Sequence, residues 1–212
     1  MLHLSSNEGG DNHASKYFLQ KLRDITLKYN VVYIVDEVQT GVGATGKLWC
    51  HEYADIQPPV DLVTFSKKFQ SAGYFFHDPK FIPNKPYRQF NTWCGEPARM
   101  IIAGAIGQEI IDRDLTSQVV RVGDYLFKKL EALQEKYPTK FHNLRGKNRG
   151  TFIAWDLPTP EERDTLLKKL KLNGCNVGGC STNSVRLRPT LTFEEKHADI
   201  FVEALAKSVT EL

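Results

Sequence analysis

Two polar side chains follow apolar, strand-like stretches of the chain, and their types could do chemistry together. Asp36 comes directly after the run Val31–Val35, and Lys67 follows Val60–Phe65. In an open α/β sheet, ligands collect at the carboxyl ends of the strands. A carboxylate and an amine at one such edge could pair with each other or hold a ligand between them. An acid after a strand can also be a cap, and the Lys67-Lys68 pair can be a solvated turn, so position alone leaves both interpretations open.

The elements that would position these residues alternate between helices and strands, which predicts an α/β fold. The run Val31–Val35 is β-branched and apolar throughout, which is typical of a strand buried on both faces of a parallel sheet. The run Val60–Phe65 predicts a second strand. Apolar residues at helical spacing predict a helix over residues 15–29, with Phe18, Leu22, Ile25 and Tyr29 on one face. Its candidate caps are Asp11, Asn12 and Ser15.

The remaining elements predict a second, smaller domain. Residues 74–86 are rich in proline and aromatic side chains and predict a loop. Helices are predicted over 98–111 and 115–137, and Pro138 ends the second of them. Short strands over 150–156, 176–178 and 184–188 then mix with helices over 159–172 and 193–212. We therefore expect residues 1–112 to belong to a large domain, 113–138 to form a connecting helix and 139–212 to form a small α+β domain.

Composition excludes several classes of protein. Of the 212 residues, 41% are hydrophobic and 25% charged, which is ordinary for a globular domain. The net charge of +3 is small and the basic residues are dispersed, so a nucleic-acid surface is not expected. No apolar run is long enough to span a bilayer. The first ten residues resemble neither a secretory signal nor a transit peptide, which makes the cytosol the default compartment.

Neither the cysteines nor the histidines predict a metal site. The four cysteines form no C-x-x-C pair, and the six histidines are scattered along the chain. Free thiols in a reducing compartment fit this pattern best. We therefore expect no metal ion.

A glycine-rich stretch requires a second hypothesis to be weighed. Residues 41–47 fit the pattern G-x-x-x-x-G-K of a nucleotide-binding phosphate loop. The next residue is Leu48, where such a loop needs a serine or threonine to reach magnesium. The stretch also begins several residues after the strand, and Trp49 starts a poor continuation into a helix. These departures make a nucleoside-triphosphatase a poor interpretation of the stretch.

Several separate motifs, in order, resemble one enzyme family. They are VDEVQTG at 35–41, TFSK at 64–67, EGGDNH at 8–13, FNTW at 90–93 and SVRLRP at 184–189. Together they resemble the class III pyridoxal-phosphate aminotransferases, and within these the enzymes that act on 4-aminobutyrate. The resemblance implies the carboxyl-terminal part of the fold-type I large domain, with a mostly parallel sheet, plus a small α+β domain. It also implies transfer of the amino group of 4-aminobutyrate to 2-oxoglutarate, giving succinate semialdehyde and glutamate.

The resemblance assigns roles to individual residues around the cofactor, pyridoxal 5'-phosphate. Asp36 matches the carboxylate beside the pyridine nitrogen, and Lys67 matches the lysine that binds the cofactor covalently and moves the proton. Val38 matches a residue that packs on the ring face, and Gln39 one near the phenolic oxygen. Thr92 matches a residue that binds the phosphate of the neighbouring subunit's cofactor, which implies a homodimer.

Two further residues match a pair that handles two differently shaped substrates. Arg186 corresponds to an arginine that binds the α-carboxylate of glutamate or 2-oxoglutarate. Glu8 corresponds to a glutamate that pairs with this arginine when the substrate is an ω-amine. An ordinary ion pair at a strand edge is the alternative.

The chain lacks family features that lie upstream in the complete enzymes. These are the phosphate-binding glycine loop, the aromatic that stacks on the ring, the arginine that holds the carboxylate of 4-aminobutyrate and the cysteine pair of iron–sulfur relatives. Residues 1–6 also do not match the strand expected before Glu8. We expect exposed strand edges and apolar surface, poor solubility without a partner chain, and weak or no transamination alone.

Three alternatives therefore stay open. One is a non-catalytic remnant of the family that serves as an interaction or regulatory module. Another is an aminotransferase for a different ω-amino acid. The third concerns location, because a lost leader would allow a mitochondrial protein.

Overall fold

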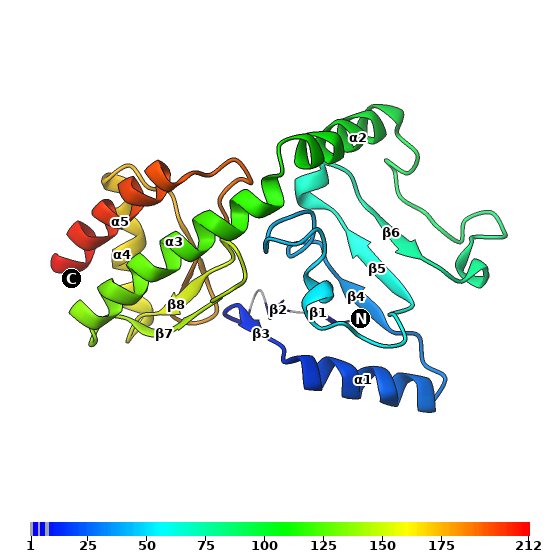
Figure 1. Ribbon diagram of the computed structural model, residues 1–212, viewed down its shortest axis with the longest axis horizontal. Helices are drawn as coiled ribbons and strands as arrows, with labels where there is room; N and C mark the ends of the chain where they lie inside the picture. The colour runs from blue at the N-terminus through cyan, green and yellow to red at the C-terminus, as the bar shows by residue number, and fades with distance from the viewer. Residues whose placement is uncertain (1, 4, 7–8) are drawn as a thin grey trace. The chain divides into compact units, whose positions relative to one another are not determined.

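The computed structural model describes residues 2–3, 5–6 and 9–212, which form two compact units (Figure 1). The first unit contains Ala14–Val42, Trp49–Arg113 and a short amino-terminal segment. The second contains a short segment that ends at His13, together with Gly43–Leu48 and Asp114–Leu212. Each unit has its own sheet and its own core, so each is described by itself.

The first unit is built on a four-stranded sheet with the order β1-β4-β5-β6. The strands β1 (Leu2–His3) and β5 (Leu62–Phe65) both pair in parallel with β4 (Ile34–Asp36). The fourth strand, β6 (Gly73–Phe76), pairs antiparallel with β5. The α/β class predicted from sequence is confirmed, but the sheet is small and partly antiparallel. Part of the loop predicted for 74–86 forms β6, because these aromatic residues pair back onto β5 as a hairpin.

The strand predicted for Val31–Val35 is displaced toward its carboxyl end. Val31 and Val32 are 55% and 43% exposed, and β4 begins only at Ile34. The reason lies in the backbone. The N–H of Val31 still donates to the carbonyl of Thr26 in the preceding helix, at 2.8 Å, so this residue follows the helix end and does not pair with a strand.

Two α-helices and three short 3-10 helices complete the first unit. The cap of α1 (Lys16–Lys28) is Ser15, whose hydroxyl accepts from the N–H of Phe18. The helix α2 (Pro97–Asp112) is capped by Glu96. The 3-10 helices are η1 (Cys50–Tyr53), η2 (Lys67–Phe69) and η3 (Pro79–Phe81). Around β4 lies a small apolar core of Leu19, Tyr33, Val35, Cys50, Ala54, Ile56 and Val60.

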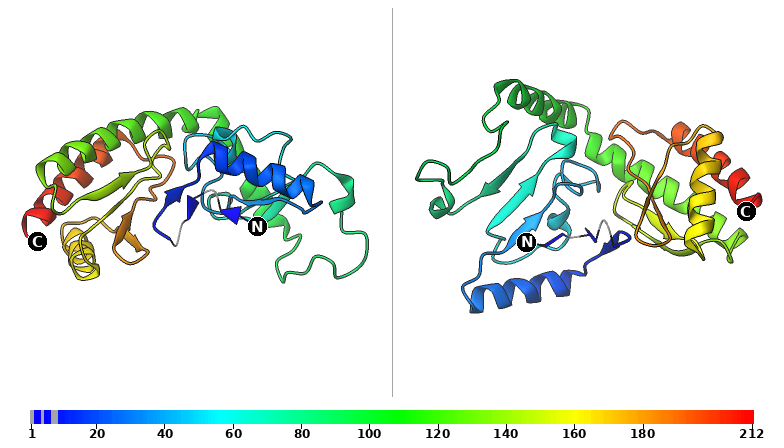
Figure 2. Two further views of the ribbon diagram at one scale, coloured as in Figure 1. Left: turned by 90° about the horizontal axis from the view of Figure 1, so that it is seen from below. Right: turned by 180° about the vertical axis from the view of Figure 1, so that it is seen from behind.

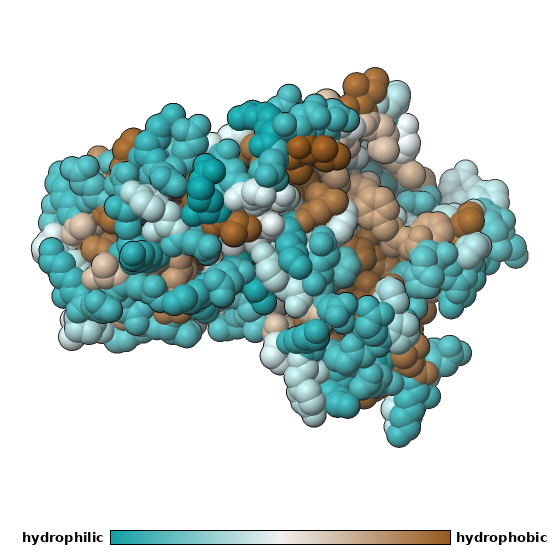
Figure 3. Space-filling model, in the orientation of Figure 1, coloured by the Kyte–Doolittle hydropathy of each residue, from teal (hydrophilic) through white to brown (hydrophobic). Residues whose placement is uncertain are grey.

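Much apolar surface of the first unit is exposed. Most of the apolar stripe predicted for α1 faces outward, since Phe18, Ile25 and Tyr29 are each at least half exposed. Leu22 alone of the stripe packs against the core, and α1 buries Leu19, Arg23 and Thr26. On α2, Ile101 and Ile111 are more than 70% exposed. Figure 3 shows apolar residues gathered over the first unit in this view, whereas the second unit presents a mostly polar face.

The second unit contains an antiparallel sheet and three helices. The sheet order is β7 (His142–Arg145), β8 (Ala154–Asp156), β10 (Ser184–Arg186) and β9 (Gly178–Cys180). The helices are α3 (Leu115–Lys136), α4 (Pro160–Leu172) and α5 (Glu195–Thr210). Figure 2 shows α3 and α5 side by side. A separate two-stranded sheet pairs β2 (Ser5–Ser6) with β3 (Asn12–His13).

The core of the second unit is large and closely packed. All six positions whose spacing predicted α3 are buried, namely Leu115, Val119, Val122, Leu126, Leu130 and Leu133. Trp155 is fully buried and stacks on Phe141 with ring centroids 5.4 Å apart. The backbone of Gly150 approaches α3 so closely that a Cβ at Gly123 would lie 2.3 Å from it, so only glycine fits there.

Two properties bear on the class of protein. All four cysteines are free thiols. Across residues 2–3, 5–6 and 9–212, no helix combines the length and the apolar character that a bilayer crossing requires.

Candidate active site

Asp36 is a buried carboxylate at the carboxyl end of β4. It is 7% exposed, and its Oδ1 accepts a hydrogen bond from the N–H of Val38 at 2.9 Å. In the parallel ladder Asp36 stands opposite Thr64 of β5. The N–H of Glu37 donates to the carbonyl of Thr64 at 3.0 Å, so strand pairing continues to this edge. The position of the carboxylate is therefore fixed by the sheet itself.

Lys67 lies two residues beyond β5 and opens the short helix η2. Its backbone adopts the left-handed conformation, with φ +45°, which costs a non-glycine residue free energy. The carbonyl of Lys67 accepts from both the backbone N–H and the side-chain amide of Gln70, at 2.8 and 3.0 Å. These bonds hold the lysine in a defined turn at the end of the strand.

Asp36 and Lys67 therefore share one edge of the sheet, as the sequence predicted for two neighbouring parallel strands. Adjacent strands lie about 4.8 Å apart and three residues span at most about 10 Å, so the two Cα atoms lie within about 15 Å of each other. Between them, the hydroxyl of Thr64 is buried and has no hydrogen-bond partner among the described residues. A buried carboxylate, an amine and an unsatisfied hydroxyl make a donor and acceptor set that fits a polar aromatic cofactor.

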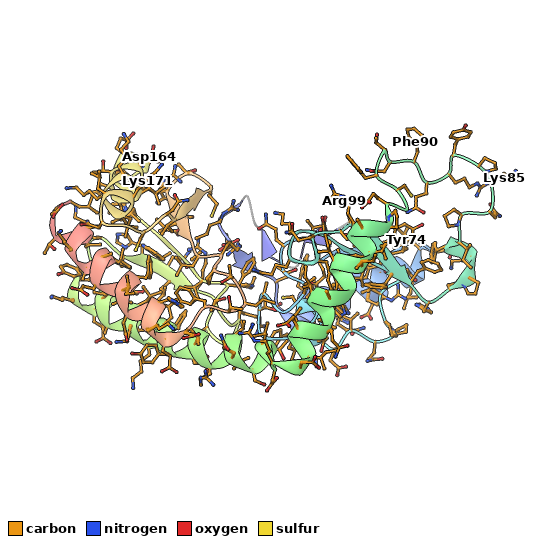
Figure 4. All side chains as sticks on the ribbon, turned by 90° about the horizontal axis from the view of Figure 1, so that it is seen from above. Tyr74, Lys85, Phe90, Arg99, Asp164 and Lys171 are labelled. Carbon is orange, nitrogen blue, oxygen red and sulfur yellow. The ribbon has the colours of Figure 1, made fainter. Side chains whose placement is uncertain are left out.

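A cavity of about 660 Å³ opens beside Lys67 within the first unit. Its lining includes Ser66, Tyr74, Trp93 and Arg99. Figure 4 shows Tyr74 on β6 and Arg99 near the start of α2. The guanidinium of Arg99 lies over the ring of Trp93, 5.1 Å from its centroid, which gives this wall both positive charge and an aromatic surface.

The turn after Asp36 is anchored by Glu37, a residue to which the sequence assigned no role. Glu37 is fully buried, and its Oε2 accepts from the hydroxyl of Thr40 at 2.5 Å. Its Oε1 accepts from the backbone N–H of His51 at 2.7 Å and lies 3.0 Å from Nδ1 of the same residue. Val38 and Gln39 lie half-buried in this turn. The only sequence signal for Glu37 was its position next to Asp36 after an apolar strand.

Thr92 lies elsewhere in the first unit, in an exposed turn over residues 92–95. The turn is stabilised by Asn91, whose side-chain oxygen accepts from the N–H of Trp93 at 2.9 Å. Asn91 and Trp93 line the cavity beside Lys67, whereas Thr92 is not part of its lining. An exposed threonine of this kind is available to a neighbouring molecule.

Of the predicted substrate pair, only one member can be described. Arg186 is the last residue of β10 in the second unit and is half-buried. It lines a cavity of about 550 Å³ together with Phe193, His197 and Arg188. Glu8 lies outside the described residues.

A charged cluster near Arg186 was also missed by the sequence. Arg188 pairs with Asp11, which is fully buried, at 2.5 Å. Arg145 pairs with Asp156 at 2.8 Å. The partners Asp11 and Arg188 are 177 residues apart in sequence, so no local pattern could have indicated the pair.

The glycine-rich stretch does not form a phosphate loop. Residues 38–49 form turns and bends, and Lys47 is followed by two bend residues and the short 3-10 helix η1 instead of an α-helix. A Cβ at Gly41 would lie 2.8 Å from the ring of Trp49, so the backbone packs closely against this ring at the start of the stretch. Among the residues described, no group of three or more histidine, cysteine, aspartate or glutamate side chains could hold a metal ion.

Comparisons with known proteins identify the family. The family model for class III aminotransferases matches residues 4–209. The chain is 88% identical to the 4-aminobutyrate aminotransferase of Saccharomyces cerevisiae over 97% of its own length and 44% of the relative's. It is 44% identical to the mitochondrial 4-aminobutyrate aminotransferase of Sus scrofa, over 92% of this chain and 39% of that protein. The chain thus spans less than half the length of these relatives.

Solved structures give the same result. The lysine aminotransferase of M. tuberculosis superposes with a TM-score of 0.92 at 30% identity, covering 99% of this chain and 48% of that one. The ornithine aminotransferase of Plasmodium yoelii superposes with a TM-score of 0.86 at 26% identity, covering 99% and 56%. With most of the chain matched by the family model and its fold shared with these enzymes, the chain belongs to the class III aminotransferases.

Proposed function

We propose that this chain carries the cofactor-binding lysine and aspartate of a pyridoxal-phosphate-dependent 4-aminobutyrate aminotransferase. The reaction moves the amino group of 4-aminobutyrate to 2-oxoglutarate and yields succinate semialdehyde and glutamate. The observation that carries the proposal is the shared sheet edge of Asp36 and Lys67. The 88% identity to the yeast enzyme supports the choice of substrate. In this proposal the first unit is the carboxyl-terminal portion of a fold-type I large domain, and the second unit is its small domain.

Each residue at the edge has a task in this proposal. When bound, pyridoxal phosphate withdraws electrons from the substrate carbon that loses its proton. The carboxylate of Asp36 favours the protonated pyridine nitrogen, because a nearby negative charge stabilises the charged form. Lys67 would hold the cofactor through its side-chain amine, and that amine would move the proton at the substrate carbon. Val38 would hold the cofactor ring by apolar packing, and Gln39 would offer a polar group to its phenolic oxygen.

The remaining assignments concern substrate and assembly. Arg186 binds the α-carboxylate of glutamate or 2-oxoglutarate, and Glu8 pairs with it when the amine substrate lacks that group. Thr92 serves the cofactor phosphate of a second subunit, which makes the working enzyme a homodimer. Amino acids and 2-oxo acids are thus the partners expected. The protein acts in the cytosol or the mitochondrion, and the porcine relative is mitochondrial by name.

The cofactor assignment is tested on this chain by adding pyridoxal phosphate and reducing with borohydride. We expect a visible absorption band before reduction, and a pyridoxyl group on Lys67 in the mass spectrum afterwards. Lys67→Ala should abolish both signals, whereas the matched variant Lys68→Ala should keep them. Label spread over many lysines, or unchanged in Lys67→Ala, would contradict the assignment and favour a non-catalytic module.

The substrate pair is tested in the complete yeast relative, which is 88% identical over this region. Replacing the residue equivalent to Glu8 by alanine should impair the 4-aminobutyrate half-reaction more than the glutamate half-reaction. Equal losses in the two half-reactions would contradict a pairing that depends on the substrate, and would favour an ordinary ion pair between these residues.

A further inference from the structure

Three side chains project from one face of the strand that carries Arg186. Val185 and Leu187 are buried in the core of the second unit. Because side chains alternate across a strand, Ser184, Arg186 and Arg188 share the opposite face. The pairing continues past β10, since the N–H of Leu187 donates to the carbonyl of Ile153 at 2.8 Å. Arg186 is therefore flanked on its own face by Ser184 and Arg188.

On the Ser184 side, Arg145 ties three segments together. Its NH2 group donates to Asp156 Oδ1 at 2.8 Å and to Ser184 Oγ at 3.0 Å, and Ser184 Oγ donates to the same Asp156 oxygen at 2.6 Å. Its Nε donates to the carbonyl of Gly10 at 2.5 Å. A Cβ at Gly10, where φ is +97°, would lie 3.0 Å from Ser184 Oγ, so the backbone segment approaches the strand directly.

On the other side, Arg188 makes a second attachment to the same segment. Its NH2 donates to Asp11 Oδ1 at 2.5 Å, and its NH1 donates to the carbonyl of Leu187 at 2.7 Å. The guanidinium carbon lies 3.2 Å from the ring centroid of Phe152. Asp11 is fully buried, and a buried carboxylate is strongly destabilising once its partner is removed. Loss of Arg188 would therefore leave Asp11 as an unpaired buried charge.

The segment Gly10-Asp11 is thus fastened to the strand on both sides of Arg186. A guanidinium that binds a carboxylate as a fork must be held within about 0.5 Å and 10–20° of its binding geometry. We propose that Arg188 and Arg145 are positioning residues that fix Arg186 for recognition of the α-carboxylate of the amino-acid substrate. This rests on the proposed function, and it assigns substrate selection to residues that need not touch the substrate.

The test uses both half-reactions of the complete yeast relative, with substitutions at the positions equivalent to Arg188. We expect Arg188→Met to raise KM for glutamate and 2-oxoglutarate about tenfold, the change that corresponds to one lost charge-assisted hydrogen bond. The kcat for 4-aminobutyrate should change less than about twofold, a difference too small to count as a lost hydrogen bond. Arg188→Lys should restore part of the KM. The control is Arg121→Met on α3, whose side chain is 67% exposed.

A second measurement reports the network without activity. Burial, followed by the positive charges of Arg149, Arg188 and Arg145, lowers the pKa of His13 to about 4. In the 212-residue chain, NMR titration of Arg188→Met should show the pKa of His13 rising while the fluorescence of buried Trp155 stays native.

The outcomes separate the two proposals. Equal losses in both half-reactions, or no loss in either, with an unchanged fold, would overturn the positioning role. If the unsubstituted enzyme transaminates neither substrate, the proposed function fails instead. If Arg188→Met does not fold, Arg188→Lys decides. For this variant, a native Trp155 signal and a KM raised for glutamate but not for 4-aminobutyrate support the positioning role. An unchanged KM for glutamate overturns it.

Discussion

The two units of the chain reach their folded states by different means. The second unit encloses a core drawn from three helices and an antiparallel sheet, with Leu130, Trp155 and Leu205 fully buried. The first unit has a small core around β4 and leaves apolar faces of α1 and α2 exposed. Part-buried polar contacts, such as the Arg23–Asp61 pair at 2.8 Å, add to this small core. The unit with Arg186 is thus self-contained, whereas the unit with Lys67 presents surface typical of a contact with other polypeptide.

The sharpest test of this difference is a matched pair of core truncations. Leu130→Ala in the second unit should lower the free energy of unfolding by about 2–5 kcal/mol, toward the upper end because the dense core cannot close the cavity. The loss from Leu19→Ala in the first unit should lie toward the lower end of this range, because its core is small. Urea unfolding followed by tryptophan emission measures both, and the substitutions Trp49→Phe and Trp93→Phe in the first unit let Trp155 report the second unit alone. A larger loss from Leu19→Ala would reverse the comparison.

The second unit should also lose stability in mild acid. The pKa of His13 is lowered to about 4, from an ordinary 6.5, by burial and by three arginines. The unfolded chain binds this proton first as the pH falls, so stability present above pH 6.5 is lost progressively toward pH 4. The loss is roughly 3 kcal/mol at most, at about 1.4 kcal/mol per pKa unit. It is measured as the Trp155 urea midpoint at pH 7 and pH 4.5.

His13→Asn is the control for this acid effect, because it removes the titrating group. Asp156 contributes little in the same window. Burial alone would raise its pKa, but hydrogen bonds from Ser184, Arg145 and Asn143 outweigh this and hold the pKa below its ordinary 3.8. If the urea midpoint falls between pH 7 and pH 4.5 as much in His13→Asn as in the unsubstituted chain, His13 is not the cause of the acid effect.

In the first unit the largest polar effect should come from Glu37. Glu37→Gln keeps the size of the side chain but weakens its bonds to Thr40 and His51. We expect a loss of about 1–3 kcal/mol, since the group is buried and hydrogen-bonded. Glu109→Gln on α2, a side chain 64% exposed, should change stability little. Similar melting temperatures for the two variants would show that Glu37 does not anchor this unit.

The smallest effect on stability, but a clear one on association, should follow from charging exposed apolar positions. Ile101→Lys on α2 alters a residue that is 74% exposed and should change the unfolding free energy by less than about 0.5 kcal/mol. Sedimentation velocity should show less self-association. Ile200→Lys on α5, at 60% exposure in the second unit, should not change the sedimentation profile. If both substitutions reduce self-association equally, or neither does, the exposed apolar surface of the first unit is not the contact that drives association.

The sequence predicted the second unit's helices and the placement of Asp36 and Lys67 well, for a physical reason. The helical spacing of α3 directly reflects which side chains the core buries, and two parallel strands must end at the same edge. It failed at Val31 and Val32, where apolar residues follow a helix end and stay exposed. The strand β7 was missed because His142 and its neighbours are polar.

The polar networks could not be predicted from the sequence, for a different reason. Contacts such as Arg188 with Asp11 join residues that only the folded chain brings together. Glu37 gave one signal, its place beside Asp36, but a buried acid cannot be told from an exposed one by its neighbours alone. The periodicity of apolar residues indicates which side chains pack in a core, but it does not indicate which charged residues pair.

The left-handed backbone at Lys67 has a consequence for how the position should be understood. A glycine there would relieve roughly 1 kcal/mol of conformational cost, so the turn itself would be better off without a side chain. Lysine is thus a poor choice for the architecture at this point. Under the proposed function, screening for variants with greater thermal tolerance would select against the amine that binds the cofactor.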